Sequence, residues 1–487
     1  MQVHKDPRMP PWHAAVCGAR LFGGGRRIGS DMLSRSLLKN TLLLTGVSLL
    51  MSCIGMAFQA WLAVRLGAAG LGLCQLTFSV TGLCATLAVS GIRFASTRLI
   101  AEELGGGDGG SVASAMRRCL FYGAFCGGGA GALLHLLAEP LGFLWIGDAR
   151  TVLSLRIAAL SMPCISLCAA LSGYFTACGR VWKPALAHLA EQLAGIALTA
   201  WLLTGSEPGD LERSCAAVTM GRAAAELLSL ALMFVLYLHD RCAHYTDRKA
   251  GGALSGRMLR IAVPLALSAY TRSALSTLQH LLVPRGLRSS GLTADAALAG
   301  YGVVQGMVMP LLFFPSCLLS SASELIVPEL TAHQVQGRSA EIRNTAGELL
   351  RLSLRYSLAV SGILFCCADL LGGLIFHSRD AARFLRLLAP LVPVMYTDMA
   401  VDGCLKGLGL QVWSMGVNIA ESALGLVLLR FLLPRWGLGA YLAILYFSEL
   451  FNLALSALRL RFFLCAAPSA ARRPDAGSVR CAYTAGR

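Results

Sequence analysis

The sequence predicts an all-α, polytopic membrane protein with about twelve transmembrane helices. Of its 487 residues, 56% are hydrophobic and only 14% are charged, whereas soluble domains carry about 25% charged residues. The apolar residues form continuous runs, and a helix needs roughly 20 of them to cross the hydrocarbon layer. Because these runs do not alternate with polar residues, they do not fit the strands of an outer-membrane barrel.

Each apolar run defines one expected helix. In the first half, the expected helices are 38–64, 71–98, 116–138, 152–177, 184–204 and 214–238. In the second half, they are 258–283, 296–320, 349–376, 384–408, 414–433 and 440–463. Most connections are short, so no soluble domain is inserted. The longest connection, 321–348, is expected to be an amphipathic or loop segment.

These helices divide the chain into five regions. Residues 37–240 and 258–463 are expected to form an N-terminal and a C-terminal six-helix bundle, with 241–257 as a cytoplasmic linker. Residues 1–36 and 464–487 are expected to be disordered, basic cytoplasmic extensions. Lysine and arginine concentrate in connections on one side, and cytoplasmic loops carry such an excess. We therefore expect a multi-pass protein of the cytoplasmic membrane with both termini in the cytoplasm.

An internal repeat relates the two halves. Residues 156–195 and 386–425 align at a constant offset that matches six residues. The pairs are Arg156 with Arg386, Pro163 with Pro393, Gly173 with Gly403, Gly179 with Gly409, Glu191 with Glu421 and Gly195 with Gly425. An even number of spans in each copy gives both copies the same orientation, which is a parallel repeat. Paired repeats of this kind are typical of transporters, whose substrate lies between the repeats.

Two arginines interrupt apolar runs and are the main candidates for substrate binding. Helical spacing puts each arginine on a polar stripe. The stripes are Thr86, Ser90, Arg93 and Thr97, and Ser268, Arg272, Ser276 and Gln279. An arginine at the hydrocarbon centre costs ~2.5–3.5 kcal/mol, and its guanidinium grips phosphate oxygens through paired hydrogen bonds. The alternatives are snorkelling to the interface, to which Arg93 lies closer, or an internal salt bridge for Arg272.

Two further residue pairs of the repeat are candidates, one for ion coupling and the other for hinges. Glu191 and Glu421 are either sites for a coupling Na⁺ or H⁺, or structural carboxylates that hydrogen-bond within each bundle. A buried carboxylate titrates at a raised pH, which is what proton coupling requires. Pro163 and Pro393 are candidate hinges for a rocking motion, or static kinks.

No motif of an enzyme, a metal site or a nucleic-acid-binding domain accompanies these features. The 17 cysteines include no C-x-x-C pair and are expected to be small buried hydrophobes. The nine histidines form no H-E-x-x-H motif, which is the zinc signature of metalloproteases. The net charge of +16 is explained by membrane topology. We expect no catalytic residue, no metal and no bound cofactor.

Two stretches resemble a known transporter family. Residues 65–104, which include "SGIRFASTRLIAEEL", and residues 172–192, "SGYFTACGRVWKPALAHLAEQ", are similar to polysaccharide and lipid-linked oligosaccharide flippases. These belong to the multidrug/oligosaccharidyl-lipid/polysaccharide exporter superfamily, which includes the multidrug and toxic-compound extrusion (MATE) transporters. The likeness is greatest to sporulation proteins of the family and covers about 38–463.

The resemblance implies two bundles that form a V-shaped central cavity, and a substrate of the undecaprenyl-pyrophosphate type. In related lipid flippases, cavity arginines meet the diphosphate, and Arg93 and Arg272 match them in kind. The leading hypothesis is an alternating-access flippase for an anionic lipid-linked oligosaccharide or cell-wall precursor, used in spore or cell envelope assembly. The alternatives are a cation-coupled multidrug exporter and a non-transporting membrane scaffold. The expected partners are the lipid-linked glycan and membrane lipids, with no nucleic acid, and the protein is expected to be a monomer.

Overall fold

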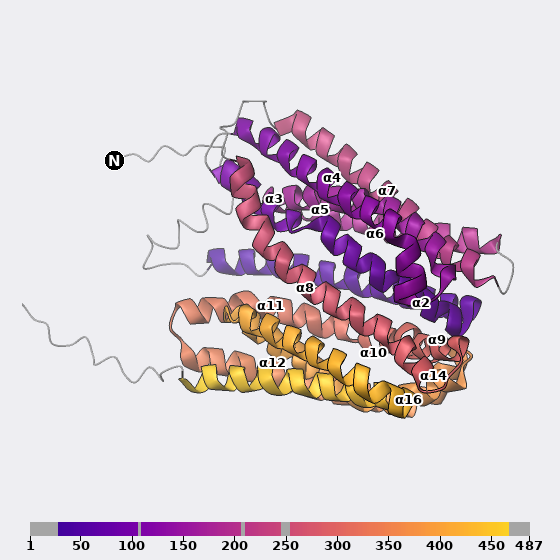
Figure 1. Cartoon of the computed structure of the whole chain (residues 1–487). Helices are drawn as coiled ribbons and strands as arrows, with labels where there is room; N and C mark the ends of the chain where they lie inside the picture. The colour runs from indigo at the N-terminus through magenta and orange to yellow at the C-terminus, as the bar shows by residue number, and fades with distance from the viewer. Residues whose placement is uncertain (1–27, 106–108, 206–209, 245–253, 467–487) are drawn as a thin grey trace, which may run out of the picture. The chain divides into compact units, whose positions relative to one another are not determined.

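The computed structural model describes residues 28–105, 109–205, 210–244 and 254–466, and within these ranges the regular elements are helices without a strand (Figure 1). The chain forms two compact units, Met1–Met51 and Ser52–Arg487. The described part of the first unit, residues 28–51, is helical.

The first half of the chain folds into long helices joined by short connections. They are α2 (Ile28–Val89), α3 (Ile92–Gly105), α4 (Gly109–Pro140), the π-helix η1 (Leu141–Ile146), the short η2 (Ala149–Thr151), α5 (Val152–Ala177), α6 (Trp182–Thr204) and α7 (Leu211–His244). Helix α2 contains a break at Gly67, where φ is +69°. This break separates the two predicted spans 38–64 and 71–98.

The second half contains more interruptions. Its elements are α8 (Leu254–Ser289), α9 (Ala294–Gly302), the π-helix η3 (Val303–Val308), α10 (Met309–Phe313), α11 (Ser316–Val335), α12 (Ser339–Cys366), α13 (Ala368–Ile375), α14 (Arg379–Leu388), η4 (Ala389–Leu391), α15 (Val392–Gly407) and α16 (Gln411–Ala466). Helix α16 breaks at Gly437, between the predicted spans 414–433 and 440–463.

The membrane character of the chain is confirmed. Within the described ranges, nine helical segments are long and apolar enough to cross a membrane. Two of them, Leu49–Leu104 and Gln411–Cys465, have 56 and 55 residues. At 1.5 Å per residue, about 80 Å of helix exceeds a hydrocarbon core of about 30 Å, so each can supply two crossings. The arrangement of the two repeats around a V-shaped cavity stays a prediction.

Two predicted segments differ from the structure. The span 71–98 is not one helix, because α2 ends at Val89 and α3 begins after Ser90 and Gly91, which both have positive φ. The connection 321–348 is not a loop, because α11 and α12 extend through most of it. The predicted spans are defined by runs of apolar residues. Such runs reveal neither a serine with positive φ nor a helix that is rich in polar residues.

The two copies of the predicted sequence repeat contain the same turn at the same position. After α5, the amides of Cys178, Gly179 and Arg180 donate to the carbonyls of Tyr174, Thr176 and Phe175. After α15, Leu408, Gly409 and Leu410 donate to Cys404, Lys406 and Leu405 at the same offset. Gly179 and Gly409 have φ of +72° and +71°. A left-handed glycine ends a helix in this way because it has no Cβ to clash.

Polar side chains join α5, α6 and α7 near the predicted cytoplasmic end of the N-terminal bundle. The Asp240 carboxylate is 2% exposed and accepts hydrogen bonds from Lys183 Nζ at 2.8 Å and Tyr174 OH at 3.0 Å. Arg180 also donates to it. Breaking a buried ion pair leaves an uncompensated charge, so this cluster is expected to fix the ends of the three helices.

Close helix packing requires glycine on α5. A Cβ added at Gly173 would lie 1.8 Å from Ser96 Oγ and 2.5 Å from the Arg93 carbonyl oxygen. Helix α3 can therefore lie directly against α5 only while residue 173 has no side chain. Nearer the start of α5, a Cβ added at Gly127 of α4 would lie 2.8 Å from Pro163 Cα.

We predict that Gly173→Ala destabilises the protein, because α3 and α5 must separate to admit the methyl group. Overpacking of this kind costs ~1–3 kcal/mol, which thermal unfolding in detergent would detect as a lower melting temperature. The matched control is Gly128→Ala on α4, where an added Cβ has no neighbour within 4 Å. Equal melting temperatures for the two variants would contradict this packing.

Candidate functional site: two cavities along α2

Helix α8 connects the two halves of the chain at the site. Near its start, the Ala262 carbonyl lies so close to Gly91 that an added Cβ would approach it to 2.6 Å. Towards its other end, Gln279 Nε2 donates to the Ser422 carbonyl of α16 at 3.0 Å. Figure 1 shows α8 running from the helices of the first half to those of the second. Helix α8 therefore packs on both halves.

Three hydrogen bonds hold α8 against α2 and the turn that follows it. Thr277 Oγ1 donates to the Ser79 carbonyl at 3.1 Å, and Thr86 Oγ1 donates to Ser273 Oγ at 3.2 Å. The Ser90 hydroxyl bonds to the hydroxyls of Tyr270 and Tyr122. These contacts fix which side of α8 faces α2.

A cavity of about 420 Å³, here called the arginine cavity, lies between α2 and α8. Its lining residues are Phe78, Ser79, Gly82 and Thr86 from α2, and Ala269, Arg272, Ser273, Ser276, Thr277 and His280 from α8. One lining residue, His280, is held by a hydrogen bond to α9, because its Nδ1 lies 3.0 Å from the hydroxyl of the buried Tyr301. Arg272 is the charged residue of this lining.

Arg272 lies at the middle of α8, about 26 Å of helix from either end at 1.5 Å per residue. Its side chain is exposed, and within the part of the chain that the structure describes it makes no hydrogen bond or ion pair. The sequence predicts that Arg272 lies inside the span 258–283, although α8 is not among the nine helical segments that are long and apolar enough to cross a membrane. Within such a span a guanidinium must face protein or water rather than lipid. The cavity therefore presents an uncompensated positive charge to whatever enters it.

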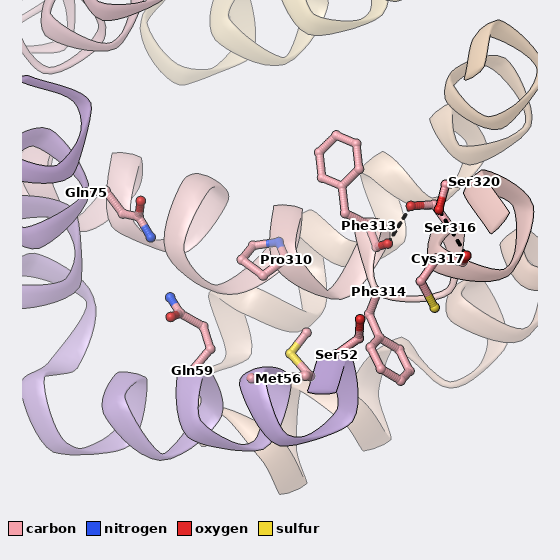
Figure 2. Close-up of a pocket in the computed structure, with 11 residues that line it drawn as sticks. Ser52, Met56, Gln59, Gln75, Pro310, Phe313, Phe314, Ser316, Cys317 and Ser320 are labelled. Carbon is pink, nitrogen blue, oxygen red and sulfur yellow. Dashed lines mark hydrogen bonds between the residues drawn. The ribbon is translucent and has the colours of Figure 1, made fainter. Parts of the chain in front are cut away.

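A second cavity of about 460 Å³, here called the glutamine cavity, lies between α2 and the α10–α11 region. Its lining residues are Ser52, Gly55, Met56, Gln59, Gln75, Pro310, Phe313, Phe314, Ser316, Cys317 and Ser320. Figure 2 shows the amides of Gln59 and Gln75 facing each other across the cavity. None of the lining residues is charged.

One face of α2 runs through both cavities. Gln75 lines the glutamine cavity, and Phe78, Ser79, Gly82 and Thr86 line the arginine cavity. These residues follow the spacing i, i+3, i+4, i+7 and i+11, which keeps side chains on one side of a helix. The two linings are therefore neighbours along one face of α2.

A third cavity, of about 270 Å³, lies inside the N-terminal bundle between α2, α6 and α7. Glu191 and Glu226 both line it, together with His188 and Arg222. Arg222 places its guanidinium 4.7 Å from the centre of the Phe78 ring, a cation–π contact. His188 Nδ1 lies 3.9 Å from Glu191 Oε2. Glu226 Oε2 is buried, and the described residues offer it no hydrogen-bond partner.

Of the predicted substrate-binding residues, Arg272 and Ser276 meet in the arginine cavity. Gln279 instead ties α8 to α16, and Ser90 is buried between two tyrosines. Arg93 is exposed on α3 and lines neither the arginine cavity nor the glutamine cavity. The turn at Ser90 and Gly91 shifts the helical phase, so the stripe predicted through Thr86 and Arg93 is interrupted.

The two repeated carboxylates lie in different surroundings. Glu191 lines the cavity of the N-terminal bundle, whereas Glu421 lies half-buried on α16. The prolines differ as well, since Pro163 lies inside α5 and Pro393 lies at the first turn of α15. Proline is tolerated at a first turn because no backbone donor is lost there.

Sequence reasoning missed Gln59, Gln75 and Phe78, and it interpreted Glu226 as the partner of Arg222 in an ion pair within one helix. The first three lie in apolar runs without a charge to mark them. Glu226 is four residues from Arg222, a spacing that suggests an ion pair within the helix. Arg222 stacks on Phe78 instead.

Charged contacts join the two halves near η1 and η2, which lie at the predicted outer end. Arg150 pairs with Asp148 at 2.6 Å and with Asp295, just inside α9, at 3.1 Å. Arg288, near the end of α8, donates to the Gly147 carbonyl at 3.2 Å. Any movement that separates the halves here must break the bonds from Arg150 to Asp295 and from Arg288 to Gly147.

Comparison of the sequence with known proteins shows which family the chain belongs to. The family model described as "Polysaccharide biosynthesis protein" matches residues 37–332, more than half of the chain. The chain belongs to this family. A second model, "MatE", matches residues 287–430.

Two curated relatives of this family member come from Bacillus subtilis (strain 168). Stage V sporulation protein B is 25% identical over 422 residues, covering 85% of this chain and 81% of the relative. Sporulation protein YkvU is 20% identical over 386 residues, covering 77% and 85%.

Solved structures with the same fold are transporters and flippases. An inward-facing multidrug resistance MATE family transporter of the MOP superfamily has a TM-score of 0.66 at 14% identity, covering 86% of this chain and 95% of that one. The lipid II flippase MurJ, in an inward closed conformation, has a TM-score of 0.68 at 12% identity, covering 86% and 87%. Together with the family match, these likenesses identify a multi-pass membrane transporter of this superfamily rather than an enzyme.

We predict that Ser90→Ala lowers stability, because it removes the shared partner of two tyrosine hydroxyls. Loss of the two hydrogen bonds of this hydroxyl costs ~1–3 kcal/mol, measurable as a lower melting temperature of the purified protein. Ser276→Ala is the matched control, since Ser276 faces a cavity and has no hydrogen-bond partner in the described chain. If Ser90→Ala melts like the wild type, the Ser90 hydroxyl has no such structural role.

Proposed function

We propose that this protein is an alternating-access flippase for an anionic lipid-linked oligosaccharide or cell-wall precursor of the undecaprenyl-pyrophosphate type. It acts in the cytoplasmic membrane as a monomer, with both termini in the cytoplasm and membrane lipids around it. The family description and the relatives named as sporulation proteins support a role in spore or cell envelope assembly.

The unpaired guanidinium of Arg272 in the arginine cavity carries this proposal. A neutral solute gives no reason to keep a charge at mid-membrane, whereas a phosphate group can accept two parallel hydrogen bonds from guanidinium. Ser276, one turn further along α8, adds a hydroxyl to the same wall. A non-transporting scaffold would not need this charge.

Alternating access requires the substrate to reach the cavity from each side in turn. The ion pair of Arg150 with Asp295 and the bond from Arg288 to Gly147 join the two halves at the predicted outer end. We propose that they break when the transporter opens outward. Charge-assisted bonds suit this role because they are directional and each contributes a modest net free energy.

A cation gradient is the proposed driving force, with Na⁺ or H⁺ bound at carboxylates of the N-terminal bundle. Glu226 is the better candidate, because its Oε2 is buried and without a hydrogen-bond partner in the described structure. Glu191 lines the same cavity. Coupling of this kind would also serve a multidrug exporter, so the carboxylates alone do not select the substrate.

We predict that Arg272→Ala lowers lipid translocation by at least about tenfold, because one or two charged hydrogen bonds are lost. Arg272→Lys retains the charge but not the paired geometry, so an intermediate rate is expected. The measurement is flipping of a fluorescent polyprenyl-diphosphate sugar in reconstituted vesicles. Arg260→Ala, on the same helix but outside the cavity lining, is the control. Normal flipping by Arg272→Ala would exclude the proposed anion site.

We predict that Glu226→Gln removes the dependence of flipping on a pH or Na⁺ gradient, because the amide neither titrates nor carries a charge. Flipping would be measured with each gradient imposed and collapsed. Glu212→Gln is the control, since Glu212 is exposed at the start of the same helix. Retained gradient dependence in Glu226→Gln would exclude this residue as the coupling site.

A further inference from the structure

We propose that the glutamine cavity binds the uncharged sugar portion of the substrate while the arginine cavity holds its phosphate. The inference rests on the proposed function, which it deepens by dividing the substrate between two linings. It is carried by the chemical contrast between the two cavities and by the face of α2 that joins them.

The lining of the glutamine cavity fits a neutral, hydroxyl-rich group. It combines two amides, three serine hydroxyls and two phenylalanine rings without a charge. A phosphate would find no cation there, and a prenyl chain would leave the amides facing hydrocarbon without partners. A sugar offers hydroxyls that donate and accept, together with an apolar C–H face.

The two glutamines differ in a way that suits recognition. Gln59 is fixed, since its Nε2 donates to the Gly306 carbonyl at 2.9 Å, which leaves its carbonyl oxygen as an acceptor. Gln75 has no hydrogen-bond partner in the described chain, so both halves of its amide remain available. A side-chain amide can donate two hydrogen bonds and accept two. Figure 2 shows both amides directed into the cavity.

The opposite wall supplies acceptors and aromatic surface. The hydroxyls of Ser316 and Ser320 donate to the carbonyls of Phe313 and Cys317 at 2.7 and 2.9 Å. Each serine oxygen therefore retains the capacity to accept from a ligand hydroxyl. Phe313 is 45% exposed, and Figure 2 shows the rings of Phe313 and Phe314 pointing in opposite directions from the backbone. Either ring can cover the apolar face of a sugar.

The separation of the two linings matches one headgroup. From Gln75 to Thr86 along α2 is about 16 Å at 1.5 Å per residue, and Phe78 lies between them on the same face. A diphosphate followed directly by a sugar can extend along this face with each part against its own lining. Arg272 would then meet the phosphate while Gln75 meets the sugar.

The test compares three lipids on the full-length protein in nanodiscs. They are an uncharged polyprenol, the corresponding polyprenyl diphosphate, and that diphosphate bearing one N-acetylhexosamine. For the wild type, the sugar should tighten binding about tenfold relative to the bare diphosphate. Gln75→Leu and Phe314→Leu should abolish this gain while leaving the affinity for the bare diphosphate unchanged.

Matched controls are Gln411→Leu, exposed at the start of α16, and Phe121→Leu, which is 76% exposed on α4. Melting temperatures would be measured for every variant, so that a folding defect is separated from a binding defect. If Gln75→Leu and Phe314→Leu both remain folded and keep the full gain from the sugar, the inference is overturned. A Gln75→Leu variant that binds all three lipids more tightly would show that the cavity takes the prenyl chain, which also overturns it.

Failure of the proposed function gives a different result. If the wild type binds the bare diphosphate no more tightly than polyprenol, and Arg272→Ala changes neither affinity, the anion site is wrong. If the diphosphate binds through Arg272 but the sugar adds nothing, the anion site stands and the sugar site is wrong.

Discussion

An unpaired guanidinium at the centre of a helix is the constraint on which the site depends. Within the predicted span 258–283, lipid could not solvate the charge of Arg272, so α8 is expected to keep that face against protein or water. The hydrogen bonds from Thr277 to Ser79 and from Thr86 to Ser273 hold α8 to α2 and fix its rotation. The same rotation directs Ser276 into the arginine cavity and leaves Gln279 to bond with α16.

Much of the fold could be predicted because lipid restricts what a chain can do. Every backbone group must find a partner within the membrane, so long apolar runs must be helices. The repeat was visible because a left-handed turn requires glycine, and Gly179 and Gly409 form the same turn. The break at Ser90 escaped prediction, since serine gives no signal for positive φ.

The candidate site could be predicted in part for a related reason. A buried charge is costly enough to stand out in a sequence, and Arg272 stood out. Neutral amides carry no such signal, and Gln59 and Gln75 lie on opposite sides of the break at Gly67. Only the folded chain brings them to one cavity. Arg93 shows the converse, because a conspicuous charge can lie on α3, outside both cavity linings.

The position of Phe78 has a consequence for how the cavities communicate. Its ring belongs to the linings of both the arginine cavity and the cavity of the N-terminal bundle, and it carries the guanidinium of Arg222. A ligand in either cavity therefore contacts a side chain that also lines the other cavity. A cation bound at Glu226 would repel the guanidinium of Arg222, which shares its cavity and lies against this ring. The Phe78 side chain would thereby couple the arginine cavity to the cavity of the N-terminal bundle.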